Sequence, residues 1–263
     1  MNQPYASGID YLAQSAKLIG RPGKAYNIVT GCRHGLDVCA CANDCWARKC
    51  ATTRLRDNPG YPYGFEPTFH PERVKAVGVR SEWLIFLNCM GDVGGNWDWR
   101  TPDPAELFNS EYLANQILQF AALNPRHILL LLTKNPAWYG LVEWPDNVWC
   151  GFSATNNAEL YMRGLQFIRS GQSWDRAWMS LEPWLDNAAP DLKGPTNRWT
   201  VIGGLSGANR RPVSDATWKW LQDETVQARR FTKRNAYLPQ WLYGSNYPAV
   251  FPREYPESWR VEK

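Results

Sequence analysis

The sequence predicts an α/β fold in which parallel strands curl into a partial or full (β/α) barrel of about six strand–helix units. Six short apolar runs alternate along the chain with stretches of helical period, which favours parallel strands joined by helices. The run Ile-Leu-Leu-Leu-Leu at residues 128–132 is apolar at every position, as is typical of a strand buried on both faces of a sheet. A chain of 263 residues can form a single domain, which we expect over residues 1–263.

The expected elements follow in chain order. Strands are expected at residues 26–31, 83–89, 127–133, 148–153, 176–181 and 199–203. Helices are expected at residues 106–123, 158–169 and 215–227. The first helix carries apolar residues such as Leu113 and Ile117 on one stripe, and the third follows Ser214, a good helix-capping residue. Residues 244–263 contain several prolines, so we expect an extended C-terminal wrap.

Composition points to a chain of the cytoplasm that does not enter a membrane. The sequence has no apolar N-terminal signal and no apolar run of membrane length. Seven cysteines form a poor disulfide framework and favour a metal site. The net charge of +4 is compatible with an anionic partner without requiring one. Many of the 15 tryptophans are expected at exposed or half-exposed positions, such as Trp97, Trp99, Trp138, Trp144, Trp184, Trp218 and Trp220. A tryptophan-rich core and surface is the favoured interpretation, with base stacking as the alternative.

Four cysteines fall within fourteen residues, between the first expected strand and a helix-like stretch: Cys32, Cys39, Cys41 and Cys45. Thiolates gathered on one loop are typical of a metal site. Four of them would close the shell of a structural zinc ion, although Cys39 and Cys41 are close for that arrangement. Three of them on an iron–sulfur cluster would leave a reactive position open. The residues alone are compatible with both a structural zinc ion and an iron–sulfur cluster.

Polar residues and glycines stand where the expected strands end. They are Met90, Gly91, Asp92, Lys134, Ser153, Glu182, Gly203 and Gly204. Because the carboxyl ends of parallel strands meet at one edge of a barrel, we expect these residues to surround one site. The glycines would let the backbone approach a ligand closely. Turn geometry is the alternative for each glycine, and ion pairing is the alternative for each carboxylate.

Several segments recur together in one known family. They are Cys-Trp-Ala at 45–47, Phe-Glu-Pro-Thr-Phe-His-Pro-Glu-Arg at 65–73, Leu-Thr-Lys-Asn-Pro at 132–136, Ser-Leu-Glu-Pro at 180–183, and Val-Ile-Gly-Gly at 201–204. In this order they resemble phage-associated radical S-adenosylmethionine (SAM) proteins, a family long labelled only as of unknown function. The resemblance runs from about residue 25 to residue 241 and implies a barrel of the radical SAM type.

The resemblance implies a [4Fe–4S] cluster held by Cys32, Cys39 and Cys45, with SAM on the open iron. Reduction by a donor such as flavodoxin or ferredoxin would cleave SAM to a 5′-deoxyadenosyl radical, which abstracts hydrogen from the substrate. It further implies a SAM pocket shaped by Trp46, Met90, Gly91, Asp92, Ser153, Gly203 and Gly204, with Lys134 and Glu182 in catalytic roles.

The chain departs from the family pattern at two places. The cysteine spacing is longer than the usual one, which leaves Cys41 as an alternative to Cys39. Leu205 stands where the family usually has a glutamate after the paired glycines.

The substrate we expect is a nucleobase in phage DNA, modified in the host cytoplasm. Paired basic residues and the abundant tryptophans are consistent with nucleic acid, and a base in duplex DNA would have to leave its stack. The alternatives are a radical SAM enzyme acting on another substrate, such as a free nucleotide or a peptide, and a zinc-stabilised nucleic-acid-binding protein without catalysis.

Overall fold

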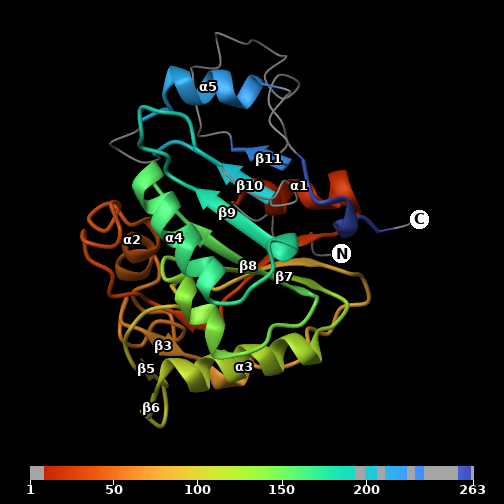
Figure 1. Ribbon diagram of the computed structural model, residues 1–263. Helices are drawn as coiled ribbons and strands as arrows, with labels where there is room; N and C mark the ends of the chain where they lie inside the picture. Colours follow the sequence, from red (N-terminus) through yellow and green to blue (C-terminus); the bar gives the residue numbers. More distant parts are fainter. Residues whose placement is uncertain (1–8, 193–198, 206–210, 224–228, 234–253, 262–263) are drawn as a thin grey trace.

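The main sheet contains seven parallel strands, which lie side by side in the order in which they occur along the chain (Figure 1). The computed structural model describes residues 9–192, 199–205, 211–223, 229–233 and 254–261. The strands within these residues are β1 (Gly23–Tyr26), β4 (Leu84–Leu87), β7 (Ile128–Thr133), β8 (Val148–Ser153), β9 (Ala177–Leu181), β10 (Trp199–Ile202) and β11 (Arg229–Thr232). Each neighbouring pair is parallel, and the sheet curls into a half-barrel. The expected α/β class and partial barrel are confirmed.

The first expected strand, at residues 26–31, is wrong in its bounds. The chain leaves the main sheet after Tyr26, and β2 (Val29–Thr30) joins a second sheet with β3 (Thr68–Phe69), β5 (Trp99–Arg100) and β6 (Leu107–Phe108). Asn88 causes this change. Its side-chain Oδ1 accepts hydrogen bonds from the N–H groups of Ile28 (2.8 Å) and Val29 (2.9 Å). These bonds take the place of a continued strand ladder.

Three helices cover one face of the half-barrel: α3 (Ser110–Leu123), α4 (Asn157–Arg169) and α5 (Asp215–Gln222). Each begins at a side-chain cap, provided by Asn109, Asn156 and Ser214. The expected start of α3 at residue 106 is wrong because Asn109 caps the helix later and β6 takes up the residues before it. The helix expected at 158–169 is confirmed. The helix expected at 215–227 ends at Gln222, and residues 224–228 lie outside the described residues.

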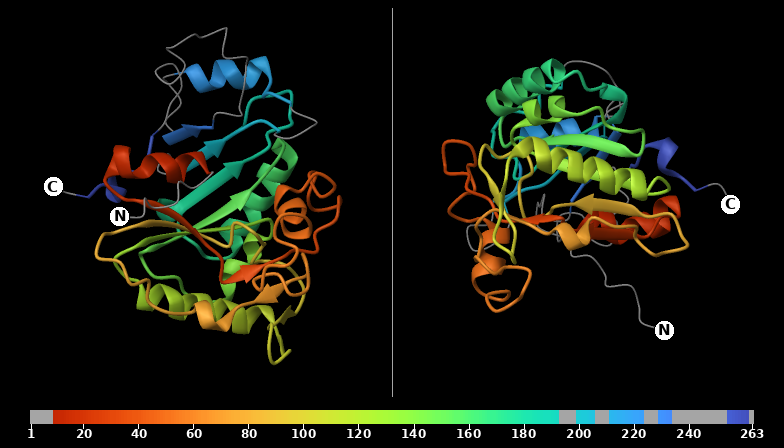
Figure 2. Two further views of the ribbon diagram at one scale, coloured as in Figure 1. Left: turned by 180° about the vertical axis from the view of Figure 1, so that it is seen from behind. Right: turned by 90° about the horizontal axis from the view of Figure 1, so that it is seen from below.

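The opposite face, here called the aromatic face, is filled by large rings. Its sheet residues include Phe86, Trp149, Trp178, Trp199 and Phe231. Helix α1 (Asp10–Ile19) and the described C-terminal residues 254–261 cover them (Figure 2). The Tyr11 ring meets the Trp199 ring edge-on at 5.4 Å, and Trp259 is fully buried. The expected wrap is therefore in contact with the core over 254–261, and its other residues lie outside the described part.

The number of units also differs from the prediction of about six. Neither β11 nor α1 was expected. Between β7 and β8 the chain forms a 3-10 helix, Pro136–Leu141, in place of an α-helix. Most of the tryptophans in the described residues are buried. The expectation of exposed or half-exposed positions is wrong for Trp99, Trp138, Trp144, Trp184 and Trp218, because all five pack into the main core. Within the described residues, no helix is long and apolar enough to cross a membrane.

The two ends of the half-barrel differ. Three large rings of the aromatic face, Trp149, Trp178 and Trp199, stand at or near the strand starts. At the carboxyl ends the chain places the cysteine loop, residues 31–45, and α2 (Trp46–Thr52). The chemistry-bearing residues are therefore gathered at the end of the half-barrel opposite these three tryptophans.

Candidate functional site

A cavity of about 160 Å³ lies at the carboxyl ends of β4, β7 and β8. Seven of the residues selected from the sequence line it: Cys32, Cys39, Cys45, Gly91, Asp92, Lys134 and Ser153. They come from the cysteine loop and from the ends of three adjacent strands. The structure thus brings these seven residues of the strand ends and the cysteine loop together around one cavity.

The cysteine loop presents three thiols to this cavity. Cys32, Cys39 and Cys45 line it, whereas Cys41 is not among the lining residues. Cys45 is also the N-cap of α2, because its sulfur accepts a hydrogen bond from the N–H of Arg48 at 3.5 Å. The sulfur of Cys32 accepts one from the N–H of His34 at 3.4 Å. Both bonds fix the direction in which the thiols point.

All seven cysteines are free thiols. Burial raises the pKa of Cys32 to about 12 and that of Cys41 to about 11, so both are protonated at neutral pH. A metal that binds here must displace such protons, which makes its binding pH-dependent. Among the described residues, no three His, Cys, Asp or Glu side chains converge closely enough to hold one metal ion.

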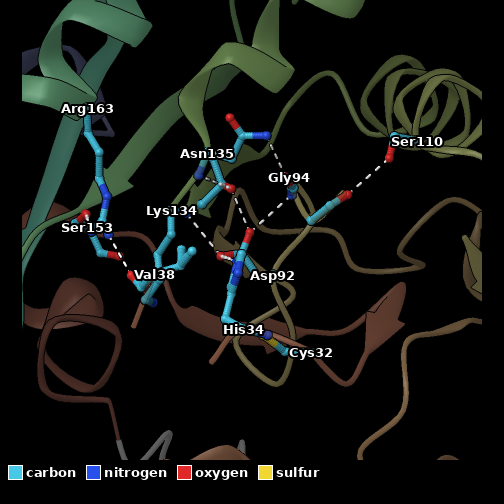
Figure 3. A network of polar contacts seen from close by, with 12 residues as sticks. Cys32, His34, Val38, Asp92, Gly94, Ser110, Lys134, Asn135, Ser153 and Arg163 are labelled. Carbon is cyan, nitrogen blue, oxygen red and sulfur yellow. Dashed lines mark hydrogen bonds and ion pairs between the residues drawn. The ribbon is translucent and has the colours of Figure 1, made fainter. Parts of the chain in front are cut away.

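Asp92 is the centre of a buried polar network (Figure 3). One carboxylate oxygen accepts hydrogen bonds from the Thr133 hydroxyl (2.6 Å) and the Gly94 N–H (3.0 Å). The other accepts from His34 Nε2 (3.0 Å) and the Lys134 N–H (3.0 Å). Burial raises the pKa of Asp92, but His34, Lys134 and Thr133 outweigh it and lower the pKa to about 2. Asp92 is therefore an anion that ties the cysteine loop to the end of β7.

Lys134 extends from the end of β7 into the same cavity. Burial lowers its pKa, but the nearby charges of Asp92, Cys39 and Cys32 together outweigh burial and the pKa is raised. The side chain is therefore an ammonium ion at neutral pH. Lys134 was expected among the strand-end residues around one site, and the structure places it in the cavity lining.

Arg163 is a second tie between the cysteine loop and the sheet (Figure 3). It comes from α4 and is only 7% exposed. Its guanidinium donates to the carbonyl of Val38 at 2.7 Å, to the carbonyl of Ser153, and to Glu159 at 3.0 Å. Because Val38 directly precedes Cys39, this bond holds the loop where the Cys39 thiol faces the cavity.

Comparison with known protein families gives one result for this chain. Residues 19–233 match the family described as "Protein of unknown function (DUF5131)". The chain belongs to the DUF5131 family. No curated protein and no solved structure matches it. The DUF5131 region includes the cysteine loop, all seven strands of the main sheet and the whole cavity.

The other selected residues of this DUF5131 chain lie outside the cavity lining. Trp46 is 58% exposed, and Met90 is buried in a small cluster with Tyr61 and Phe65 beside the cysteines. Glu182 forms an ion pair with Lys233 at 3.0 Å. Gly203 accepts a backbone hydrogen bond from Trp184, and Gly204 follows it. Leu205 pairs with Arg211 through the backbone. None of these residues is part of the cavity lining: Trp46 begins α2, and the others follow strand ends.

Three lining or supporting residues were not selected from the sequence: Asn88, His34 and Arg163. Asn88 and His34 stand beside selected residues, at a strand end and in the cysteine loop. Arg163 carries a recognisable pattern, because it occupies the apolar stripe of α4 between Leu160 and Phe167. A charged residue in such a stripe needs a buried partner, so its position alone indicated an internal contact.

Proposed function

We propose that this chain is a radical SAM enzyme in which Cys32, Cys39 and Cys45 ligate a [4Fe–4S] cluster. The observation that carries the proposal is that these three thiols of one loop line a single cavity, at the carboxyl edge of a curled parallel sheet. Cys41 does not line that cavity, which supports Cys39 as the middle ligand. The motif resemblance supplies the identity of the cofactor.

The residues present fit such a group in their chemistry. Thiolates are the ligands that iron–sulfur clusters take from proteins, and three of them leave one iron open. When bound, the cluster would supply the electron that cleaves SAM and starts hydrogen abstraction from the substrate. The protein supplies ligand direction and charge: His34 and Arg48 donate backbone hydrogen bonds to the sulfurs of Cys32 and Cys45. Hydrogen bonds of this kind tune the potential of a cluster.

Within this proposal, the polar ties act as positioning groups. The Asp92–His34 bond and the Arg163–Val38 bond hold the two ends of the cysteine segment 32–39 against the sheet. Gly91 is required by the fold, since a Cβ there would lie 2.9 Å from the carbonyl oxygen of Gly31. Trp46, Met90, Gly203, Gly204 and the catalytic role of Glu182 remain proposals from the resemblance.

For the substrate we propose a nucleobase in DNA, on the resemblance and the net charge of +4. The described basic pairs add no support. Arg230 donates to the carbonyls of Trp220 and Asp223, and Lys233 is paired with Glu182. These cations are engaged in internal contacts. The proposed electron donor, a flavodoxin or ferredoxin, and the cytoplasmic location likewise rest on the sequence.

The proposal is tested by electron paramagnetic resonance of the full chain after anaerobic reconstitution with iron and sulfide. We expect a reduced [4Fe–4S] signal that changes when SAM is added, together with release of 5′-deoxyadenosine. A sample that is silent and holds one zinc ion per chain would refute the proposal and leave a structural metal site. A signal that SAM does not alter would refute the open iron position.

A further inference from the structure

Two buried hydrogen-bond donors in the cavity lining have no partner. The side-chain nitrogen of Asn88 and the hydroxyl of Ser153 make no hydrogen bond, and the two residues are only 3% and 4% exposed. Buried polar groups in folded proteins are nearly always hydrogen-bonded, so each exception calls for an explanation. Both residues line the same cavity, at the ends of β4 and β8. A ligand in that cavity is the explanation that covers both.

The direction of the Asn88 amide is determined by its other contacts. Its Oδ1 accepts from two backbone N–H groups, of Ile28 and Val29, so the amide cannot turn over without losing both bonds. The nitrogen is therefore left on the other side. The backbone of Asn88 is in the left-handed region, with φ of 62°, which non-glycine residues rarely adopt and which is common at functional sites.

A third donor stands between these two. Lys134 is at the end of β7, the strand between β4 and β8, and within the described residues no hydrogen bond or ion pair of its ammonium group is found. Neighbouring strands lie about 4.8 Å apart, and the register sets Lys134 level with Ser153 on the adjacent strand. Asn88 stands on the other side of β7, and all three side chains line the same cavity.

The carboxylate in the cavity lining has no oxygen left to balance these donors. Asp92 is the carboxylate in the lining, and both of its oxygens already accept two hydrogen bonds from the protein. The guanidinium-bearing Arg48 also lines the cavity. A ligand that enters must therefore bring acceptors and negative charge.

We propose that Asn88, Lys134 and Ser153 form a binding subsite for an oxyanion, the carboxylate or phosphate end of a small-molecule ligand. A cavity of about 160 Å³ is similar in volume to one that holds a benzene-sized molecule. It can enclose one end of a ligand and not a whole nucleotide. The subsite does not depend on the iron–sulfur proposal, since only donors of the protein itself define it.

The test is calorimetric titration of the full chain, without added iron, against two pairs of probes. L-methionine is compared with L-methioninol, which lacks the carboxylate, and thymidine monophosphate with thymidine, which lacks the phosphate. We expect one probe that carries an oxyanion to bind at least tenfold more tightly than the counterpart that lacks it. Whichever pair shows the difference identifies the oxyanion as carboxylate or phosphate. If neither oxyanion-bearing probe binds better than its counterpart, the proposal is overturned.

Variants then assign the binding to the three donors. Lys134→Met should weaken the preferred anion at least tenfold, and Asn88→Asp, which keeps the acceptor but replaces the donor, should do the same. Ser153→Ala should weaken it at least threefold. Lys17→Met, at an exposed position on α1, should change nothing. Unaltered binding in well-folded Lys134→Met and Ser153→Ala would overturn the assignment, and Ser153→Ala decides if the lysine variant does not fold.

The outcome is separable from that of the proposed function. Anion binding without a SAM-sensitive resonance signal would support the oxyanion subsite and refute the radical SAM proposal. A SAM-sensitive signal without donor-dependent anion binding would support the radical SAM proposal and refute the subsite.

Discussion

Replacing Asp92 by asparagine tests whether the buried network holds the cysteine loop to the sheet. The asparagine oxygen can still accept from Thr133 and Gly94, as one carboxylate oxygen does now. Its NH₂ group then faces the N–H of Lys134 and the ring of His34, both of which donate to the other oxygen in the wild type. The bond from Lys134 is lost, and His34 keeps its contact only if its Nε2 is unprotonated.

The loss in free energy of unfolding caused by Asp92→Asn can be worked out from the structure in two ways. A hydrogen bond to a charged group is worth about 1.5–3 kcal/mol, so losing one or two costs about 1.5–6 kcal/mol. The pKa of Asp92 falls from 3.8 to about 2 on folding, which at about 1.4 kcal/mol per pH unit corresponds to about 2 kcal/mol. We therefore expect Asp92→Asn to lower the free energy of unfolding by about 2–3 kcal/mol at pH 7.

The lowered pKa of Asp92 also determines how the stability difference between wild type and Asp92→Asn depends on pH. Because the folded pKa lies below the unfolded one, the carboxylate's contribution is complete above about pH 4 and is lost as the pH falls toward 2. The difference between wild type and variant should shrink over that interval. His34, Lys134, Thr133 and the Cys32 thiol are the groups that face Asp92.

Urea unfolding followed by circular dichroism measures both effects, as a lower midpoint with an unchanged slope. The matched control is Glu257→Gln, which removes the exposed ion pair with Arg260 and should cost less than about 1 kcal/mol. A loss of less than about 0.5 kcal/mol at pH 7 for Asp92→Asn would refute the view that this network stabilises the fold.

Three further predictions concern the loop and the sheet. Cys45→Ser keeps an oxygen to cap α2 but no soft thiolate, so iron binding and the SAM-sensitive signal should vanish with circular dichroism unchanged. Cys41→Ser should keep both, and the reverse pattern would change the ligand set. Arg163→Ala should release the loop at Val38 and speed the alkylation of Cys39, followed by mass spectrometry, by at least about tenfold. The control Arg169→Ala changes an exposed arginine of the same helix and should leave the alkylation rate unchanged. Equal alkylation rates in wild type and Arg163→Ala would contradict the view that Arg163 holds the loop. Gly151→Ala brings a Cβ within 2.3 Å of the Trp178 ring nitrogen and should cost about 1–3 kcal/mol in thermal unfolding. Gly164→Ala, in α4 with nothing within 4 Å, should gain about 0.5–1 kcal/mol; the opposite order would contradict the packing argument.

The central strands were predictable because their burial leaves a local trace. Strands β7 and β8 are buried over nearly their whole length, so their residues form the continuous apolar runs that the prediction used. Strand β11 leaves no such trace. It begins Arg-Arg, and Arg230 is buried only because its guanidinium reaches the carbonyls of Trp220 and Asp223. A charged residue of this kind is not recognisable as a strand residue from local pattern.

The gathering of the site was also predictable, since it follows from topology. Once parallel strands are inferred, their carboxyl ends must share an edge, and the cysteine loop follows the first of them. This reasoning placed Cys32, Cys39, Cys45, Lys134 and Ser153 together, and they line one cavity. It also selected Glu182, Gly203 and Gly204, which stand at the same edge on β9 and β10 but outside that cavity. Topology predicts the edge and not the position along it.

The residue types at the strand ends and their approximate grouping are thus contained in the amino-acid order, because strand burial and parallel connection are local properties. The amino-acid order does not show which of these polar groups already have hydrogen-bond partners within the protein. Asp92 reads from the sequence as a ligand-binding carboxylate, yet four internal donors occupy it, whereas Asn88 and Ser153 keep donors without partners. Three of the four contacts to Asp92 join residues 41 to 58 positions apart, and the bond from Arg163 to Val38 joins residues 125 positions apart. Hydrogen-bond satisfaction at such separations depends on the packed chain, and no local pattern encodes it.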